Sequence, residues 1–151
     1  ADASAPLGWS VSVLDARPEY ASEELWPDAE ECIAAEPGAF LARETTESLA
    51  RFSHVLLLGH DWAIDESLLI GLLERNDGRP RIGCIGSKAK WRAFEKSALQ
   101  AGISQNTLDT VICPIGVTIG AESPQEIAIA VLAQIIAEIK GVDPASPSWR
   151  D

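Results

Sequence analysis

The stretches that decide the fold are HVLLLGHD at residues 54–61 and RIGCIGSK at residues 81–88. Each begins as an apolar run, stops abruptly at small or ionisable residues, and passes into a pattern typical of a helix. Continuous apolar runs of this length are typical of strands buried in a parallel sheet. In such sheets the chemistry gathers at the carboxyl ends of the strands. The polar residues after each run are therefore the first candidates for a functional site.

Strand and helix patterns alternate along the rest of the chain. Strands are predicted at 9–15, 39–42, 54–59, 81–85 and 111–113, and the acidic segment 18–36 is expected to be irregular. Helices are predicted at 44–51, 61–76 and 88–101, and from a capping box at Ser123 to Gly141. This alternation predicts an α/β fold with a doubly wound, mainly parallel sheet of the Rossmann type. One domain is expected over residues 1–142, followed by a tail at 143–151.

The composition is that of an acidic globular protein. Of the 151 residues, 46% are hydrophobic and 23% charged, which suits one domain with a single core. The net charge of −11 argues against general binding to nucleic acids or anionic membranes. Most of the basic residues nevertheless fall between Arg75 and Lys96. This basic island indicates either a local anion site or solvated helix faces.

Cysteine usage and hydropathy give no sign of secretion. Cys32, Cys84 and Cys113 are far apart and form no Cys-x-x-Cys motif, so neither a disulfide framework nor a zinc site is expected. No signal peptide is visible, and the apolar stretch at 127–139 is too short to span a bilayer. We therefore expect a cytoplasmic protein.

The clearest candidate site follows the second apolar run, where Gly86, Ser87, Lys88 and Lys90 open a helix. Free backbone N–H groups at a helix start favour anions. Lysines in a first turn oppose the helix dipole by about 0.3–1 kcal/mol each, unless an anion binds beside them. The sequence therefore predicts a phosphate-type anion site, although it lacks the full P-loop motif. The alternative is that Ser87 caps the helix and the lysines are solvated.

Asp15 closes the first predicted strand and is followed by Arg17. In a dinucleotide-binding fold, an acid at that place hydrogen-bonds a ribose hydroxyl and a nearby arginine accepts a 2′-phosphate. The Gly-x-Gly-x-x-Gly turn that should precede the acid by about 20 residues is not in the chain. An NAD(P)-dependent oxidoreductase is one alternative here, and a strand-end Asp that only makes a turn is the other.

His60, Asp61 and Asp65 gather where the first apolar run ends. Asp61 is expected to cap the next helix and Asp65 to favour its dipole, which leaves His60 as the stronger functional candidate. One histidine with two carboxylates is a weak set of metal ligands, so no metal site is predicted.

Cys113 lies just before Pro114 and Gly116. A thiol at that place could contact a soft metal or carry sulfur, or it could simply fill a small buried space. Cys84, inside an apolar strand, is expected to belong to the core.

Several of these motifs, in this order, resemble the C-terminal Rossmann-like domain of the XdhC/CoxI family. They are GHD at 59–61 with Asp65, IGSK at 85–88 with Lys90, CPIG at 113–116 and GAESPQEIA at 120–128. The strand at 11–14, with Asp15 and Arg17 after it, resembles the family's second strand. The resemblance covers residues 7–140, nearly the whole chain.

Members of that family resemble xanthine dehydrogenase accessory factors. The resemblance implies a non-catalytic chaperone that binds molybdenum cofactor (molybdopterin), protects it while its terminal sulfur is installed, and delivers it to a molybdenum hydroxylase such as xanthine dehydrogenase. It places the pterin phosphate at 86–88 and turns Cys113 or His60 towards the dithiolene and metal. A cysteine desulfurase as a second partner and a homodimer are further expectations. The expected cofactor-binding residues are Asp15, Arg17, His60, Asp61, Gly86, Ser87, Lys88, Lys90, Cys113 and Gly116.

The chain departs from the family pattern in two places. Gly59 stands where the family has a threonine-like residue, and the family's strand and glycine-rich turn before region 7–9 are missing. The strands ending at Asp15 and Gly59 would then lack a shared neighbour. We expect that the chain is a fragment or that another segment fills this gap, and direct pairing of the two strands would contradict that expectation.

The acidic segment 19–47 differs from the rest of the chain. It holds nine acidic residues, with Arg43 as its base, and it includes Tyr20 and Trp26. Aromatic residues are favoured at protein interfaces, so this segment is a candidate docking surface. The alternative is that both aromatic side chains pack on the edge of the domain's own sheet.

Overall fold

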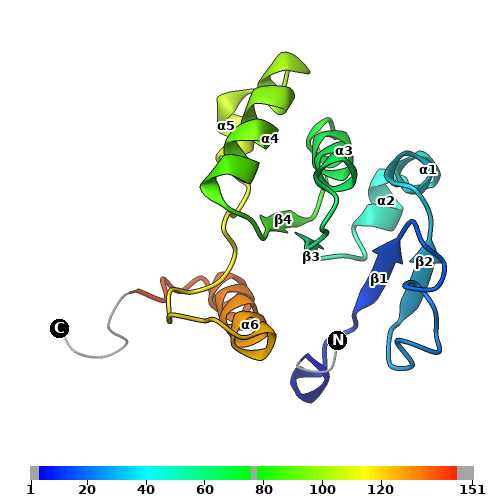
Figure 1. The fold of residues 1–151 in the computed structure, drawn as a ribbon, viewed down its shortest axis with the longest axis vertical. Coiled ribbons are helices and arrows are strands. Elements are labelled where there is room, and N and C mark those ends of the chain that lie inside the picture. The colour runs from blue at the N-terminus through cyan, green and yellow to red at the C-terminus, as the bar shows by residue number, and fades with distance from the viewer. Residues whose placement is uncertain (1–3, 76–77, 146–151) are drawn as a thin grey trace.

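Short parallel strands alternate with helices in the computed structural model, which describes residues 4–75 and 78–145 (Figure 1). The elements, in chain order, are η1 (Ala5–Leu7), β1 (Ser12–Asp15), β2 (Glu31–Ala34), α1 (Pro37–Arg43), α2 (Thr46–Leu49), β3 (His54–Leu57), α3 (Trp62–Leu73), β4 (Arg81–Cys84), α4 (Lys88–Gln100), α5 (Gln105–Leu108) and α6 (Pro124–Lys140). The predicted Rossmann-like α/β class is confirmed.

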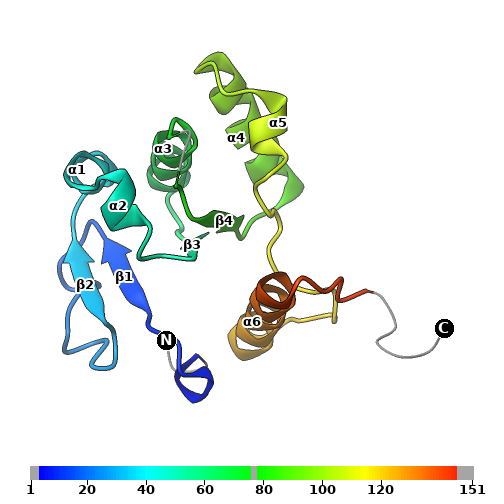
Figure 2. The same cartoon turned by 180° about the vertical axis from the view of Figure 1, so that it is seen from behind.

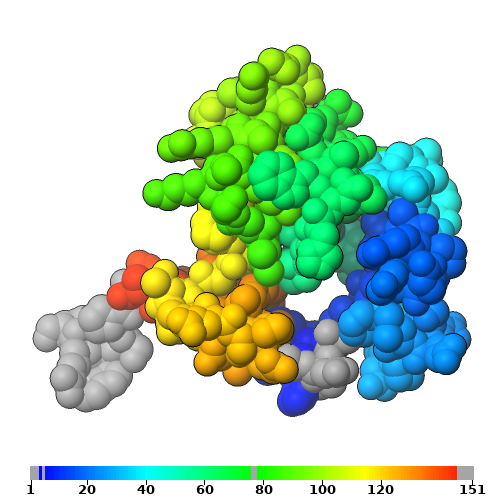
Figure 3. Space-filling model, in the orientation of Figure 1, coloured from blue at the N-terminus to red at the C-terminus, as the bar shows by residue number. Residues whose placement is uncertain are grey.

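The strands form two separate parallel pairs. In one, β1 pairs with β2, and in the other, β3 pairs with β4. A parallel bridge from Gly83 to Ile112 adds a third segment beside β4. Within the described residues β1 and β3 are not paired with each other, and the two ribbon views show the pairs apart (Figures 1 and 2). The space-filling view is hollowed between the blue β1–β2 region and the orange α6 (Figure 3). The expected lack of a shared neighbour is therefore observed.

Helices cover both faces of the β3–β4 pair, with α3 and α4 on one side and α6 on the other (Figure 1). The larger core cluster fills the first face, where Leu57, Cys84 and Phe94 are almost fully buried. Leu56 and Ile85 pack on the opposite face against Ile115 and residues of α6. Successive residues of a strand point to opposite faces of its sheet, so the continuous apolar runs at 54–58 and 82–85 are explained by burial on both sides.

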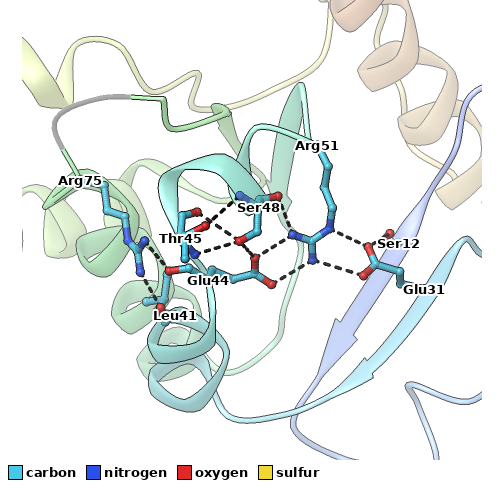
Figure 4. Close-up of polar contacts among 8 residues, drawn as sticks. All are labelled: Ser12, Glu31, Leu41, Glu44, Thr45, Ser48, Arg51 and Arg75. Carbon is cyan, nitrogen blue, oxygen red and sulfur yellow. Dashed lines mark hydrogen bonds and ion pairs between the residues drawn. The ribbon is translucent and has the colours of Figure 1, made fainter.

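A guanidinium joins the β1–β2 pair to the helices that follow it (Figure 4). Arg51 donates from Nε to Glu31 Oε2 at 3.0 Å and from Nη1 to Glu44 Oε2 at 2.7 Å. Ser12 of β1 also donates to Glu31, at 3.1 Å. At the far side of the same network, Arg75 donates to the backbone oxygens of Glu44 and Leu41. These bonds hold β2, the α1–α2 connection and the end of α3 together.

Local capping signals behave as predicted. Ser123 and Glu126 form the capping box of α6, and Gly141 ends that helix with φ of 65°. Asp61 caps α3 and Ser87 caps α4 through their side chains. Gly102, predicted as the C-cap of α4, follows that helix with φ of 90°.

Two predictions about the N-terminal part are wrong. Residues 39–42, expected as a strand, lie in helix α1, which begins with Pro37 in the position that proline favours. The segment 18–36, expected to be irregular, contains β2. The connection from β1 to β2 is made of turns instead of the helix that usually links parallel strands, so the alternating pattern gave no sign of it.

Other differences are smaller. The strand expected at 111–113 is reduced to the bridge at Ile112, and α5 was not predicted. Cys84 is fully buried, as expected for a core residue. Most of the tail predicted at 143–151 lies outside the described residues. Across 4–75 and 78–145, no helix is long and apolar enough to cross a membrane.

Candidate functional site

The residues that follow β3 and β4 lie at one edge of the sheet. Because the two strands are parallel neighbours, their carboxyl ends meet there. His60 and Asp61 follow β3, and Gly86, Ser87 and Lys88 follow β4. Asp61 Oδ1 accepts from Ala63 N at 2.9 Å, and Ser87 Oγ accepts from Lys90 N at 3.2 Å. Each strand therefore passes directly into a capped helix, α3 or α4, whose N-terminus points to this edge.

A buried ion pair joins the two helix starts. Lys90 Nζ lies 2.8 Å from Asp65 Oδ2, and the two side chains are only 6% and 7% exposed. The same ammonium donates to Ile85 O at 3.1 Å, and the same carboxylate oxygen accepts from Gly59 N at 3.1 Å. Every bond in this set joins the first turn of a helix to the strand end beside it. The pair therefore sets the geometry of both loops.

The two lysines of the predicted anion site have different environments. Lys90 is buried and its ammonium is already bound by Asp65, whereas Lys88 is exposed. Sequence reasoning treated them alike, as first-turn cations that oppose the dipole. The structure shows that Lys90 is compensated from within the protein. Lys88, together with the first-turn N–H groups of α4 that have no intrahelical acceptor, is left to meet an anion from outside.

Gly59 is required by the ion pair. A Cβ atom at this position would lie 2.6 Å from Asp65 Oδ1, an atom that cannot retreat because Lys90 and the Gly59 N–H hold its carboxylate. Gly86 is close to the same pair, since its Cβ would lie 2.7 Å from Lys90 Cδ. The glycine that departs from the family pattern is therefore explained by close packing on Asp65.

Cys113 lies beside Cys84 of β4. The two thiols contact each other, and this contact, aided by the Lys90 charge, lowers the pKa of Cys113. The contact and the burial of Cys84 raise the pKa of the Cys84 thiol. Gly116, three residues on, has φ of 125° and donates its N–H to Gln134 Oε1 of α6 at 2.8 Å. Its backbone thus anchors the loop to α6.

Asp15 and Arg17 are not brought to this edge by strand pairing, because they follow β1 in the other sheet. Arg17 Nε and Nη2 each donate to the Asp15 carboxylate at 3.0 Å, and this pairing lowers the pKa of Asp15. The Arg17 guanidinium also lies 4.0 Å from the centre of the Tyr20 ring. Both carboxylate oxygens are engaged within the loop itself.

The two histidines differ in setting. His60 is exposed at the carboxyl edge. His54 opens β3 at the opposite edge, where its Nε2 lies 3.0 Å from Glu138 Oε2 of α6. Arg81 donates to the other oxygen of Glu138 at 2.8 Å, so this cluster fastens α6 to the start of the sheet. In the described part of the chain no group of three or more metal-ligating side chains comes together.

Two hollows line the amino edge of the sheet. One is bordered by Arg81, Thr110 and Gly78, and the other by His54, Glu138 and Ile139. Both lie at the opposite end of the strands from the capped loops. We place the candidate site at the carboxyl edge because the helix starts, the exposed lysine and the perturbed thiol are there.

Sequence reasoning missed two features of this edge. One is the Asp65–Lys90 pair, and the other is the contact of Cys84 with Cys113. Asp65 and Lys90 occupy first-turn positions on helices that follow adjacent strands, and this common placement is the signal that could have paired them. The contact of the thiols depends on the bridge at Ile112, which only the fold reveals.

The fold and its capped strand ends define a Rossmann-like α/β domain that presents helix N-termini at the carboxyl edge of its sheet. The chain belongs to the XdhC Rossmann domain family, whose model matches residues 1–135. It is 32% identical over 144 residues to a protein of Bacillus subtilis named as a probable xanthine dehydrogenase component, covering 94% of this chain and 39% of that protein. It is 30% identical over 136 residues to the uncharacterized protein YqeB of Escherichia coli, covering 90% of this chain and 24% of that protein.

A solved structure has the same fold. It is described as a xanthine dehydrogenase from Bacillus halodurans, with a TM-score of 0.75 and 29% identity. The match covers 98% of this chain and 40% of that one. The chain therefore spans about two fifths of the Bacillus relatives and about a quarter of the E. coli relative.

Proposed function

We propose that this domain binds molybdenum cofactor through its phosphate and holds it for delivery to a molybdenum hydroxylase of the xanthine dehydrogenase type. The observation that carries the proposal is the start of α4, where exposed Lys88 and the cap residue Ser87 face outward while Lys90 is neutralised by Asp65. A phosphate there meets free N–H groups, the positive end of the helix dipole and one mobile cation. Family membership and the names of the relatives support the cofactor and the acceptor.

The residues at the edge fit an anionic ligand in distinct ways. In the proposal, Gly86 allows close approach, Ser87 holds the helix start, and Lys88 contacts the phosphate. Lys90 acts as a positioning residue through Asp65. Cys113 and His60 lie towards the rest of the ligand. When bound, the cofactor supplies its dithiolene-held molybdenum to the acceptor enzyme, and the domain contributes binding and protection.

A binding role is favoured over catalysis by the way the polar side chains are used. His54 is tied to Glu138 on the opposite edge of the sheet, and Asp15 is tied to Arg17 on the other sheet. An NAD(P)-dependent oxidoreductase would need the Asp15 carboxylate for a ribose hydroxyl, but Arg17 occupies it. Steady oxidation of NAD(P)H with any aldehyde substrate would contradict the proposal.

Lys88→Ala is expected to weaken binding of molybdopterin about tenfold, because one charge-assisted contact to the phosphate is lost. The matched control is Lys96→Ala, which removes another exposed lysine from the same helix two turns further on. Binding is measured by equilibrium dialysis, with the fluorescent oxidised pterin released by acid as the readout. Equal affinity in the two variants would remove the phosphate from this helix start.

The acidic segment is proposed as the surface that meets the acceptor. Tyr20 and Leu25 are about half exposed, at 47% and 48%, while Trp26 folds back to donate from Nε1 to Tyr20 O at 2.8 Å. Replacing Glu23, Glu24 and Glu30 by lysine is expected to slow delivery to the hydroxylase roughly tenfold at low salt and to reduce its salt dependence. Cofactor binding should not change. Glu74→Lys with Glu122→Lys serves as the control, and an equal effect of that pair would remove the segment from the docking surface.

A further inference from the structure

Cys84 and Cys113 occupy neighbouring positions on adjacent parallel segments. Ile112 N donates to Ile82 O and Cys84 N donates to Ile112 O, both at 2.9 Å, which sets Gly83 opposite Ile112. The next residue on each segment is a cysteine, so the two cysteines come side by side. Adjacent strands lie about 4.8 Å apart, and a disulfide joins Cα atoms that are about 4.4–6.8 Å apart. The register therefore suits a covalent bridge.

The two side chains also lie on the same face of the sheet. Cys84 belongs to the larger core cluster and Cys113 packs against that cluster, with the thiols in contact. Their accessibility differs, since Cys84 is fully buried and Cys113 is only partly buried. A small oxidant from solvent thus meets Cys113 first, and Cys84 is the thiol next to it.

The charges around the pair favour reaction at the outer sulfur. The Lys90 ammonium stabilises a thiolate at Cys113, and the contact with Cys84 lowers the pKa of Cys113 further. Low pKa and partial exposure are the properties of redox-sensitive cysteines, which often stand next to a resolving thiol. Cys32 differs because it lies on β2 in the other sheet, where its sulfur contacts Trp26 O at 4.0 Å.

We propose that Cys84 and Cys113 form a reversible intramolecular disulfide when a peroxide oxidises Cys113. The Cys113 thiolate attacks hydrogen peroxide, so an S–O bond forms, the O–O bond breaks, and hydroxide leaves as water after taking up a proton. Cys84 then attacks the Cys113 sulfenic acid, forms the S–S bond, and displaces the oxygen as a second water. Two thiols lose two electrons in all, and one peroxide becomes two waters. A thiol reductant such as glutathione reverses the reaction by exchange.

The bridge changes what the carboxyl edge presents. It removes the Cys113 thiol from the loop after β4 and fastens that loop to the core. The inference does not rest on the proposed function, because the disulfide forms or fails to form without any cofactor. It can therefore be tested on the 151-residue protein alone.

The experiment treats the reduced protein with hydrogen peroxide, blocks remaining thiols with N-ethylmaleimide in denaturant, and measures the intact mass and the tryptic peptides. Before oxidation all three cysteines should be labelled. After oxidation only Cys32 should be labelled, and the unlabelled protein should be lighter by about 2 Da, the mass of the two hydrogens lost. Peptide 82–88 should be joined to peptide 97–140. Dithiothreitol should restore all three labels.

Three variants separate the possible outcomes. Cys32→Ser is the matched control and should form the disulfide at the wild-type rate. Cys113→Ser should leave Cys84 fully labelled, and Cys84→Ser should leave Cys113 to oxidise to sulfinic acid. Cys113 is partly exposed, so its variant tests the proposal even if Cys84→Ser fails to fold. Sulfinic acid at Cys113 of the wild-type protein with Cys84 still labelled, or bridging through Cys32, would overturn the proposal.

Discussion

Replacing Lys90 by methionine is expected to lower the free energy of unfolding by about 3–5 kcal/mol at pH 7, because Asp65 is left as a buried carboxylate without its cation. Both side chains are less than a tenth exposed, so water cannot take over the role of the ammonium. Asp65 would keep only the bond from Gly59 N. The loss is measured as the shift of the urea midpoint at an unchanged slope.

Two further variants test this explanation. Lys88→Met removes an exposed lysine two residues earlier and should change stability by no more than about 0.5 kcal/mol. Adding Asp65→Asn to Lys90→Met removes the orphan charge and keeps an oxygen that can accept from Gly59 N, so most of the loss should be recovered. A Lys90→Met protein within about 1 kcal/mol of wild type would show that the pair does not hold the two loops together.

The parts of the fold that could be predicted are those decided by local chemistry. The apolar run at 54–58 is a strand because both faces of the sheet are covered, and the run itself reflects that burial. The α6 boundaries follow from Ser123, Glu126 and Gly141, each of which acts on its own turn. Asp61 and Ser87 were predictable caps for the same reason.

The parts that were missed depend on partners far away in the sequence. β2 is a strand because it pairs with β1, yet its residues lie in an acidic stretch without clear alternation. Residues 39–42 are apolar enough for a strand or a helix, and their position over α3 decides for the helix: a Cβ added at Gly71 of that helix would lie against Leu41 Cδ1. At the site, Lys90 looks like a surface cation in the sequence. Its neutralisation by Asp65 depends on the adjacency of β3 and β4.

Stability is expected to fall as the pH drops from about 4.5 to about 2 through protonation of Glu44. The hydrogen bonds from the Arg51 guanidinium lower the pKa of Glu44 from 4.5 to about 2, so the folded chain binds this proton more weakly than the unfolded chain does. The stabilisation is therefore fully present above pH 4.5 and is lost as the pH falls through about 2. Arg51 is 34% exposed, and solvent screening reduces its worth to about 1–2 kcal/mol.

Arg51→Met tests this contribution because the guanidinium is the shared partner of Glu44 and Glu31 (Figure 4). At pH 7 the variant should lose about 2 kcal/mol of unfolding free energy, since two carboxylates lose their cation. Between pH 4.5 and pH 2 its stability should fall less steeply than that of the wild type, because the pKa of Glu44 returns towards its ordinary value. Urea unfolding at a series of pH values measures both effects.

The control is Arg43→Met, which removes an exposed arginine next to Glu44 that makes no hydrogen bond to it in the described structure. It should leave the acid dependence close to that of the wild type, and Glu44→Gln should flatten the dependence as Arg51→Met does. If Arg51→Met and Arg43→Met lose stability in parallel down to about pH 2, the acid response comes from other carboxylates. The join between the β1–β2 pair and the helices would then depend on packing around Phe40 and Leu49, both almost fully buried in the same core cluster, instead of on the guanidinium.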